Sequence, residues 1–85
     1  MDAFVGIVGD YNPRNPTHLA TDEALRNLGL RFEWVSTTDL DGNVDQSLAH
    51  YDGLWIAPAS PYRSMKGALQ AIRYARERGV PLVAT

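Results

Sequence analysis

Cysteine is absent from the 85 residues, which excludes a disulfide, a thiolate metal ligand and a cysteine nucleophile within them. Long apolar runs are absent as well, and the N-terminus lacks the basic-then-apolar pattern of a signal peptide. Charge of one sign is not in excess, because the net charge is only −2; this gives no electrostatic case for binding nucleic acid or an anionic membrane. We expect a soluble cytoplasmic protein without nucleic-acid or membrane partners, bound metal or cofactor.

Four apolar segments are present, separated by stretches of helical character. They span Ala3–Gly9, Leu30–Val35, Leu54–Ala57 and Val80–Ala84. Unbroken apolar runs are typical of strands covered on both faces, whereas Leu30–Val35 alternates between apolar and polar residues, which favours an edge strand. Strands that alternate with helices predict a parallel sheet. We therefore predict an α/β fold, a parallel four-stranded sheet in the order 2-1-3-4 with flanking helices, corresponding to the flavodoxin-like half of a doubly wound sheet.

Three helices are predicted between these strands. The first begins at Asn15–Pro16 or Thr17 and ends at Gly29, because Asn or Thr suits the cap and Pro the first helical position. A loop over 37–42 leads to a short helical turn near residues 44–49. The third helix begins at Ser64 and ends at Gly79. The expected apolar face of the first helix is Thr21, Ala24, Leu25 and Leu28, and that of the third is Met65, Ala68, Leu69, Ile72 and Ala75.

Ligands of such sheets bind beyond the carboxyl ends of the strands, which here lead into the loops 10–15, 36–42 and 57–64. Gly6 and Gly9 invite a dinucleotide interpretation, but their G-x-x-G spacing is not the fingerprint, and we favour packing glycines. An acidic cluster for metal or acid–base chemistry is one interpretation of four aspartates; caps and turns are the one we favour. The four are Asp10, Asp39, Asp41 and Asp52.

The two histidines and two tryptophans have simple interpretations. His18 and His50 lack a second ligand at a metal-binding spacing, so we interpret them as surface or hydrogen-bonded histidines. Trp34 and Trp55 are interpreted as core residues. The loop after the third strand is more informative, because small residues between a strand and a helix can direct backbone N–H groups at a developing oxyanion.

A run of short matches starts at Leu54. It consists of Pro58-Ala59-Ser60, Tyr62-Arg63-Ser64, Tyr74-Ala75-Arg76-Glu77 and Val80-Pro81-Leu82-Val83-Ala84-Thr85. This run resembles the class I glutamine amidotransferase domain, most closely that of CTP synthase and its stand-alone relatives. There a strand is followed by P-G-G-F-G-x-R-G, a helix ending Y-A-R-E, and I-P-x-L-G-I. Two further matches are Val8-Gly9-Asp10-Tyr11 to the family's V-G-K-Y and Glu23-Ala24-Leu25 to its E-A-L.

The resemblance implies that residues 1–85 are one partial domain, the N-terminal half of the amidotransferase fold. In that family a cysteine at the next position attacks the side-chain amide of glutamine, and a later histidine and glutamate complete the triad. Backbone N–H groups of the P-G-G loop stabilise the oxyanion, and the ammonia goes to an acceptor, which is UTP in CTP synthase. The resemblance therefore implies glutamine as the substrate of a full-length relative.

By position, the oxyanion and substrate-binding loop comprises Ala59, Ser60, Tyr62 and Arg63, with Asp10 and Tyr11 as further cleft candidates and no catalytic residue in the chain. Both glycines of the family's loop are replaced, and Pro61 has no N–H to donate. This departure fits a divergent CTP synthase-like protein better than a true CTP synthase.

Thr85 precedes the expected nucleophile, and three explanations stay open: a fragment, a genuine truncation, or a UGA selenocysteine codon interpreted as a stop, which would make the parent a selenoprotein. We expect the chain to be inactive on its own and to form a homodimer, or otherwise self-associate, through Val80–Ala84, an unpaired edge. The alternative is a small flavodoxin-like binding or interaction module that does not catalyse a reaction.

Overall fold

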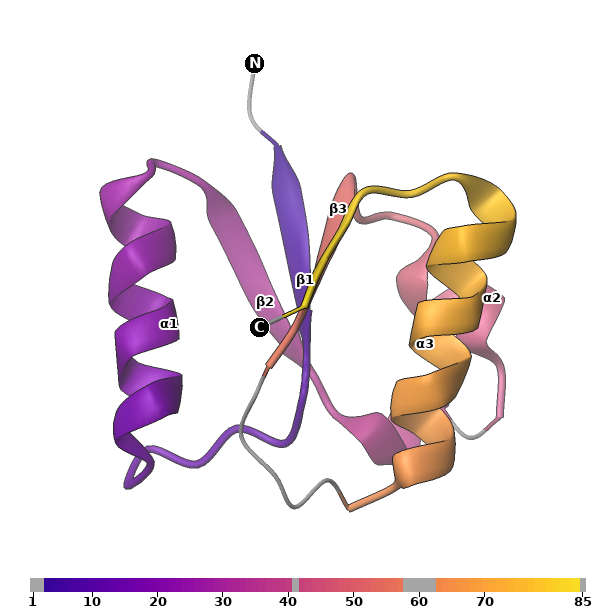
Figure 1. Ribbon diagram of the computed structural model, residues 1–85, viewed down its shortest axis with the longest axis horizontal. Coiled ribbons are helices and arrows are strands. Elements are labelled where there is room, and N and C mark those ends of the chain that lie inside the picture. The colour runs from indigo at the N-terminus through magenta and orange to yellow at the C-terminus, as the bar shows by residue number, and fades with distance from the viewer. Residues whose placement is uncertain (1–2, 41, 58–62, 85) are drawn as a thin grey trace.

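The computed structural model describes residues 3–40, 42–57 and 63–84, which form a parallel sheet covered by helices on both faces (Figure 1). In chain order the elements are β1 (Phe4–Val8), α1 (Pro16–Asn27), β2 (Arg31–Val35), the 3-10 helix η1 (Thr37–Leu40), α2 (Val44–Leu48), β3 (Gly53–Ile56), α3 (Met65–Arg78) and β4 (Leu82–Ala84). The sheet order is β2-β1-β3-β4, and every pairing is parallel. The predicted fold class, with β1 inside the sheet and β2 at an edge, is confirmed.

The helix α1 begins as its sequence predicts but buries a different face. Asn15 is the N-cap, and its Oδ1 accepts the Thr17 N–H at 2.9 Å, while Pro16 takes the first helical position. The predicted face is wrong in part, because Ala24 and Leu28 are exposed. The buried residues are His18, Thr21, Asp22 and Leu25. Polar residues can occupy this face because they form hydrogen bonds: Thr21 Oγ1 donates to the Thr17 carbonyl oxygen, Asp22 accepts from Trp34 Nε1 of β2, and His18 Nδ1 accepts the Asn12 N–H.

The helix α3 also has the predicted ends and a rotated face. Ser64 caps its N-terminus, and Gly79 ends it with a left-handed φ of 68°. The predicted stripe is wrong at Met65 and Leu69, each 57% exposed. The buried residues are Gly67, Ala68, Ala71, Tyr74 and Ala75. Most of these residues are small because η1 packs closely against α3. The prediction of a loop over 37–42 is wrong for η1, a 3-10 helix in which Thr37 and Leu40 are fully buried.

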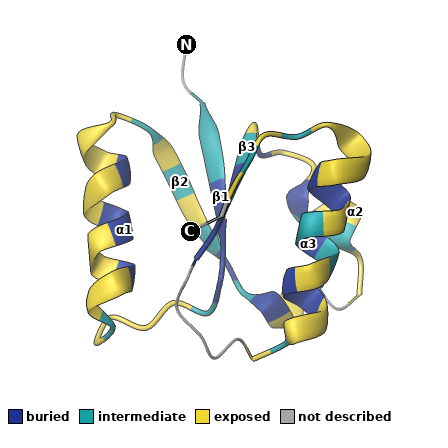
Figure 2. Ribbon diagram, in the orientation of Figure 1, coloured by how far each residue is buried: buried dark blue, intermediate teal, exposed yellow. Residues whose placement is uncertain are grey.

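Two apolar clusters fill the space on the two faces of the sheet. The larger lies between the sheet and α2 and α3, and the smaller, centred on Ile7 and Leu25, lies between the sheet and α1 (Figure 2). A Cβ on Gly6 would lie 2.8 Å from the ring of Tyr51, and one on Gly9 would lie 2.9 Å from the Cβ of Ala57. The packing interpretation of both glycines is confirmed. Trp34 and Trp55 are half-buried and pack against the smaller cluster.

The sheet face that α1 covers is partly exposed near β4. Trp34, Ile7, Trp55 and Val83 are in register and form one row across that face of the sheet. The row ends in an apolar groove of about 290 Å³ between the C-terminal end of α1 and strands β3 and β4, where Val83 is 49% exposed. No helix in the described part of the chain is both long and apolar enough to cross a membrane.

Candidate functional site at the carboxyl edge of the sheet

The carboxyl ends of the strands meet at the lower edge of the sheet in Figure 1, and the Asp10 carboxylate joins the segments that leave it. Its Oδ1 accepts hydrogen bonds from Ser36 Oγ at 2.8 Å and the Thr37 N–H at 3.0 Å. Its Oδ2 accepts hydrogen bonds from Thr37 Oγ1 at 2.6 Å and the Arg63 N–H at 2.7 Å. One carboxylate thus connects the end of β1, the β2–η1 junction and the entry to α3.

Thr37 extends this network into α3. Its Oγ1 accepts the Ser64 N–H at 2.9 Å, and Ser64 Oγ accepts the Gly67 N–H at 3.0 Å to cap the helix. Gly67 is required here, because a Cβ would lie 1.9 Å from the Thr37 carbonyl oxygen. The first turn of α3 is therefore held against η1 by hydrogen bonds and by direct backbone contact.

The network determines the charge state of Asp10. Partial burial raises the pKa of its carboxyl, but the hydrogen bonds from Thr37, Arg63 and Ser36 outweigh burial and hold the pKa below the ordinary 3.8. Among the described residues Asp10 forms no ion pair. It is therefore an unpaired anion at the edge of the sheet near neutral pH, stabilised by hydrogen-bond donors.

An aromatic cluster lies next to Asp10 on the α1 side. The ring centroid of Trp34 is 4.9 Å from that of Tyr11 and 4.8 Å from that of His18, and Trp34 Nε1 donates to Asp22 Oδ1 at 2.7 Å. His18 is 2% exposed; its Nδ1 accepts the Asn12 N–H at 2.9 Å. Burial, a hydrogen bond to Asp22 and the charge of Asp22 raise the pKa of Tyr11. The cluster fixes the loop after β1.

The structure gives the positions of some of the predicted site residues, and their roles stay predictions. Ala59, Ser60 and Tyr62 lie outside the described residues, as does Asp41. Arg63 is exposed, and its N–H is bound to Asp10. Asp10 and Tyr11 lie at the predicted edge.

The four aspartates do not form one cluster in the described part of the chain. Asp52 lies at the opposite edge, where its Oδ2 accepts the Phe4 N–H at 2.8 Å. Asp39 lies exposed on η1. Across 3–40, 42–57 and 63–84 no three His, Cys, Asp or Glu side chains are grouped so that they could hold a metal ion. The turn-and-cap interpretation is wrong for Asp10 and Asp52, because each accepts hydrogen bonds from segments distant in sequence and neither caps a helix.

Sequence reasoning missed Thr37, Gly67 and the His18–Trp34–Asp22 group. A signal for the first two was present. Hydroxyl residues directly after a strand favour turns that bind nearby backbone groups, and an isolated glycine within a helical pattern indicates close packing. No spacing rule links His18 and Asp22 to Trp34, because that pairing depends on how α1 sits over β2.

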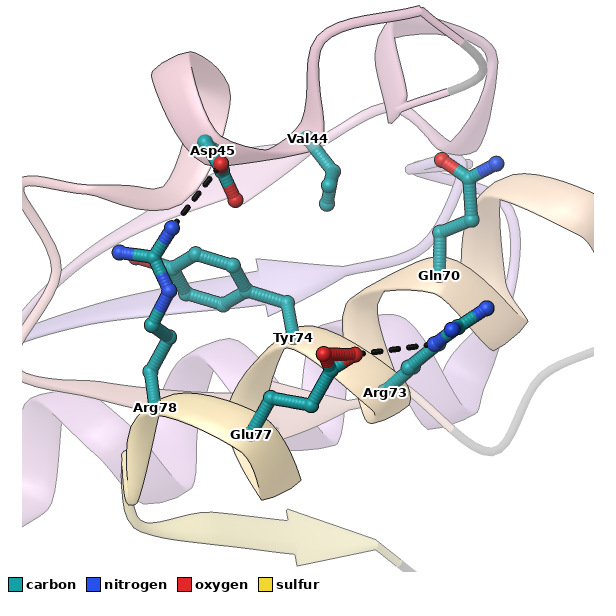
Figure 3. Close-up of a pocket in the computed structure, with 7 residues that line it drawn as sticks. All are labelled: Val44, Asp45, Gln70, Arg73, Tyr74, Glu77 and Arg78. Carbon is teal, nitrogen blue, oxygen red and sulfur yellow. Dashed lines mark hydrogen bonds and ion pairs between the residues drawn. The ribbon is translucent and has the colours of Figure 1, made fainter.

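A second groove, of about 280 Å³, lies between α2 and the C-terminal half of α3 (Figure 3). Arg78 pairs with Asp45 at 2.9 Å across the groove, and Arg73 pairs with Glu77 at 2.9 Å along α3. Tyr74 lies beneath Arg78, whose Cζ is 5.3 Å from the ring centroid. Each arginine is neutralised by a carboxylate, so the groove offers no net charge to a ligand, and it lies away from the network of Asp10.

Comparison with known proteins gives a consistent result. The chain is 36% identical to the CTP synthase of Streptococcus thermophilus over 86 residues, which is 93% of this chain and 16% of that protein. It is 34% identical to the CTP synthase of Archaeoglobus fulgidus over 96% of this chain and 16% of that protein. It is 32% identical to the CTP synthase of Thermomicrobium roseum over 91% of this chain and 15% of that protein. No protein-family model matches. The chain thus spans about one sixth of these relatives, and it is homologous to that segment of CTP synthase.

Proposed function

We propose that the chain forms the N-terminal part of a CTP synthase-like glutamine amidotransferase domain, one that supplies ammonia from glutamine in pyrimidine nucleotide metabolism in the cytoplasm. The observation that carries this proposal is the identity of 32–36% with CTP synthases over more than nine tenths of the chain. The parallel β2-β1-β3-β4 sheet supports it, since residues 10–15 and the carboxyl end of β3 then lie at one edge of the sheet, where ligands of this class bind.

On its own the chain should not hydrolyse glutamine. No cysteine is present in the 85 residues to form an acyl-enzyme. We therefore expect the purified chain to release ammonia from glutamine only at the rate of a heat-denatured control. Release above that rate would contradict this part of the proposal.

A chimera tests the role of the segment. The segment of the Streptococcus thermophilus enzyme that aligns with this chain would be replaced by it, and CTP formation would be measured with ammonia and with glutamine as the nitrogen source. The ammonia-dependent rate reports whether the rest of the enzyme is intact. We expect that rate to be retained and the glutamine-dependent rate to be reduced but measurable, because both family glycines are replaced at Ala59 and Ser60.

A second chimera sharpens the result. Ala59→Gly with Ser60→Gly restores the family's loop residues and should raise the glutamine-dependent rate without changing the ammonia-dependent rate. A matched control is Gly42→Ala, at an exposed position with open space around it. Loss of all glutamine-dependent activity in both chimeras, with ammonia-dependent activity intact, would favour the alternative of a non-catalytic binding module.

We further propose that the isolated chain self-associates through β4. The support is the position of β4 at the sheet edge, next to the apolar groove that includes Trp55 and Val83. Unpaired backbone groups beside an exposed apolar surface recruit another strand, and a symmetric dimer buries both. Sedimentation equilibrium should give a mass above that of the 9.4 kDa monomer. Val83→Lys should return it to the monomer, and a wild-type chain that is monomeric at micromolar concentration would refute the proposal.

A further inference from the structure

The Asp10 carboxylate joins its own segment to two others that are distant in sequence. It lies after β1, and its four donors come from Ser36 and Thr37 after β2 and from Arg63 at the entry to α3. Each oxygen accepts two hydrogen bonds, and the two shortest, at 2.6 and 2.7 Å, both end on Oδ2. An ionised carboxylate can accept all four, whereas a carboxylic acid must use one oxygen as a donor.

We propose that Asp10 is a positioning residue, which when ionised holds Arg63, at the entry of α3, against β1 and η1 and when protonated releases Arg63. This proposal concerns regulation of the proposed glutaminase site and therefore rests on that function, but the holding itself involves only this chain. The family motif matched by Val8-Gly9-Asp10-Tyr11 has lysine where this chain has Asp10. An ammonium group could not accept these four hydrogen bonds, so the device is a property of this sequence.

Neighbouring ionisable groups do not account for the lowered pKa of Asp10. The nearest along the three joined segments are Tyr11 after β1, Asp39 on η1, and Arg63 and Lys66 at the start of α3. None of them forms an ion pair with Asp10 within the part of the chain that the structure describes. Hydrogen bonds alone counter the burial of the carboxyl and keep it ionised to lower pH than a free aspartate.

Because the backbones of Gly67 and Thr37 are in contact, Arg63 can be released from Asp10 without unfolding of η1 or the sheet. Thr37 is fully buried and its carbonyl packs on Gly67, so η1 stays in place when Asp10 is protonated. The Arg63 N–H, by contrast, has Asp10 as its acceptor and belongs to an exposed residue. Protonation should therefore act first on Arg63, while the sheet remains intact.

The experiment follows amide protons of the full 85-residue chain by NMR from pH 7 to pH 2. The Arg63 and Thr37 amide protons should move upfield together with the Asp10 carboxyl resonance, with a common midpoint below 3.8. The protection of the Arg63 amide, measured as its exchange rate relative to the intrinsic rate at the same pH, should then fall about tenfold or more, the loss expected for one charge-assisted hydrogen bond. The amides of Ile7 and Leu54, inside the sheet, should keep their protection through this transition.

Two variants complete the test. Asp10→Asn leaves one oxygen acceptor where there were two, so the Arg63 amide should exchange fast at pH 7 and lose its titration. Asp39→Asn, which removes an exposed carboxylate of η1, should leave both unchanged. An Arg63 amide that fails to follow the Asp10 carboxyl, or that behaves alike in the two variants, would overturn the proposal. Neither readout involves glutamine, so a failure here is distinct from a failure of the chimera.

Discussion

Replacing Gly67 by alanine should destabilise the chain although alanine is the better helix former. Gly67 lies in the first turn of α3, where it faces the backbone of η1. The new Cβ would lie 1.9 Å from the carbonyl oxygen of Thr37, 2.9 Å from its carbonyl carbon and 3.3 Å from Leu40 Cβ. An ordinary contact begins at 3.4 Å, so the carbonyl or the helix must move by more than an ångström.

The surroundings resist that movement. The Thr37 N–H and Oγ1 are bound to Asp10, and Thr37 Oγ1 also accepts the Ser64 N–H, so shifting the carbonyl strains several hydrogen bonds together. Greater helix propensity contributes at most about 1 kcal/mol in favour of alanine. Overpacking of a rigid site costs about 3 kcal/mol or more. The net loss should be about 2 kcal/mol, which corresponds to a fall in Tm of about 8–16 °C in a domain of this size.

Urea unfolding followed by circular dichroism measures this change, with the midpoint lowered by about 1 M or more. All samples should share one protein concentration, because self-association would add to the apparent stability. Gly42→Ala is the matched control, since a Cβ there meets nothing within 4 Å, and it should be neutral or slightly stabilising. A midpoint for Gly67→Ala equal to or above that of the wild type would show that α3 and η1 can move apart to accommodate the new Cβ without loss of stability.

Two further predictions follow from perturbed side chains. The pKa of Asp10 is lowered in the fold, so its contribution to the free energy of unfolding is fully present above pH 3.8 and is lost as the pH falls through the folded pKa. Asp10→Asn should lower the free energy of unfolding by about 2 kcal/mol at pH 7 and make it depend less on pH in the acid range. Tyr51 donates to Glu33 at 2.6 Å, and burial followed by this bond raises its pKa well above 10.0. The contribution of Tyr51 to the free energy of unfolding should therefore be present below pH 10.0 and fall as the pH rises above it. Tyr51→Phe should lower the free energy of unfolding, measured with urea, by about 1 kcal/mol at pH 7 and should remove its decrease at alkaline pH.

The element order and sheet topology could be predicted because they depend on local signals. Pro16 and Ser64 mark helix starts, Gly29 and Gly79 mark helix ends, and the alternation over residues 30–35 marks an edge strand; all of these agree with the structure. Helix faces were predicted less well because apolar periodicity assumes that burial follows hydrophobicity. In α3 the close approach of η1 selects small residues for the buried face and leaves Met65 and Leu69 outside.

From the sequence, two of the predicted site residues could be placed at one edge of the sheet, but their contacts could not be predicted. Parallel topology places Asp10 and Arg63 at one edge, and the structure confirms this placement. The partner that joins them, Thr37, was assigned to a loop, because a four-residue 3-10 helix has too few residues to show periodicity. The pairing of Asp22 with Trp34 lies beyond any local pattern, since it depends on tertiary packing alone.

The charge of Asp10 constrains how the proposed chemistry can work. An oxyanion develops negative charge and needs N–H donors that are not already engaged. The N–H groups of Arg63 and Ser64 lie at the start of α3, but they are bound to Asp10 and Thr37. Like charges at close range repel, so an ionised Asp10 disfavours an oxyanion beside these donors. Near neutral pH a working glutaminase built on this chain must therefore take its oxyanion donors from residues other than Arg63 and Ser64. Ala59 and Ser60 are the positions that the resemblance offers, and this is why the chimera restores glycine at those two positions and leaves Asp10 unchanged.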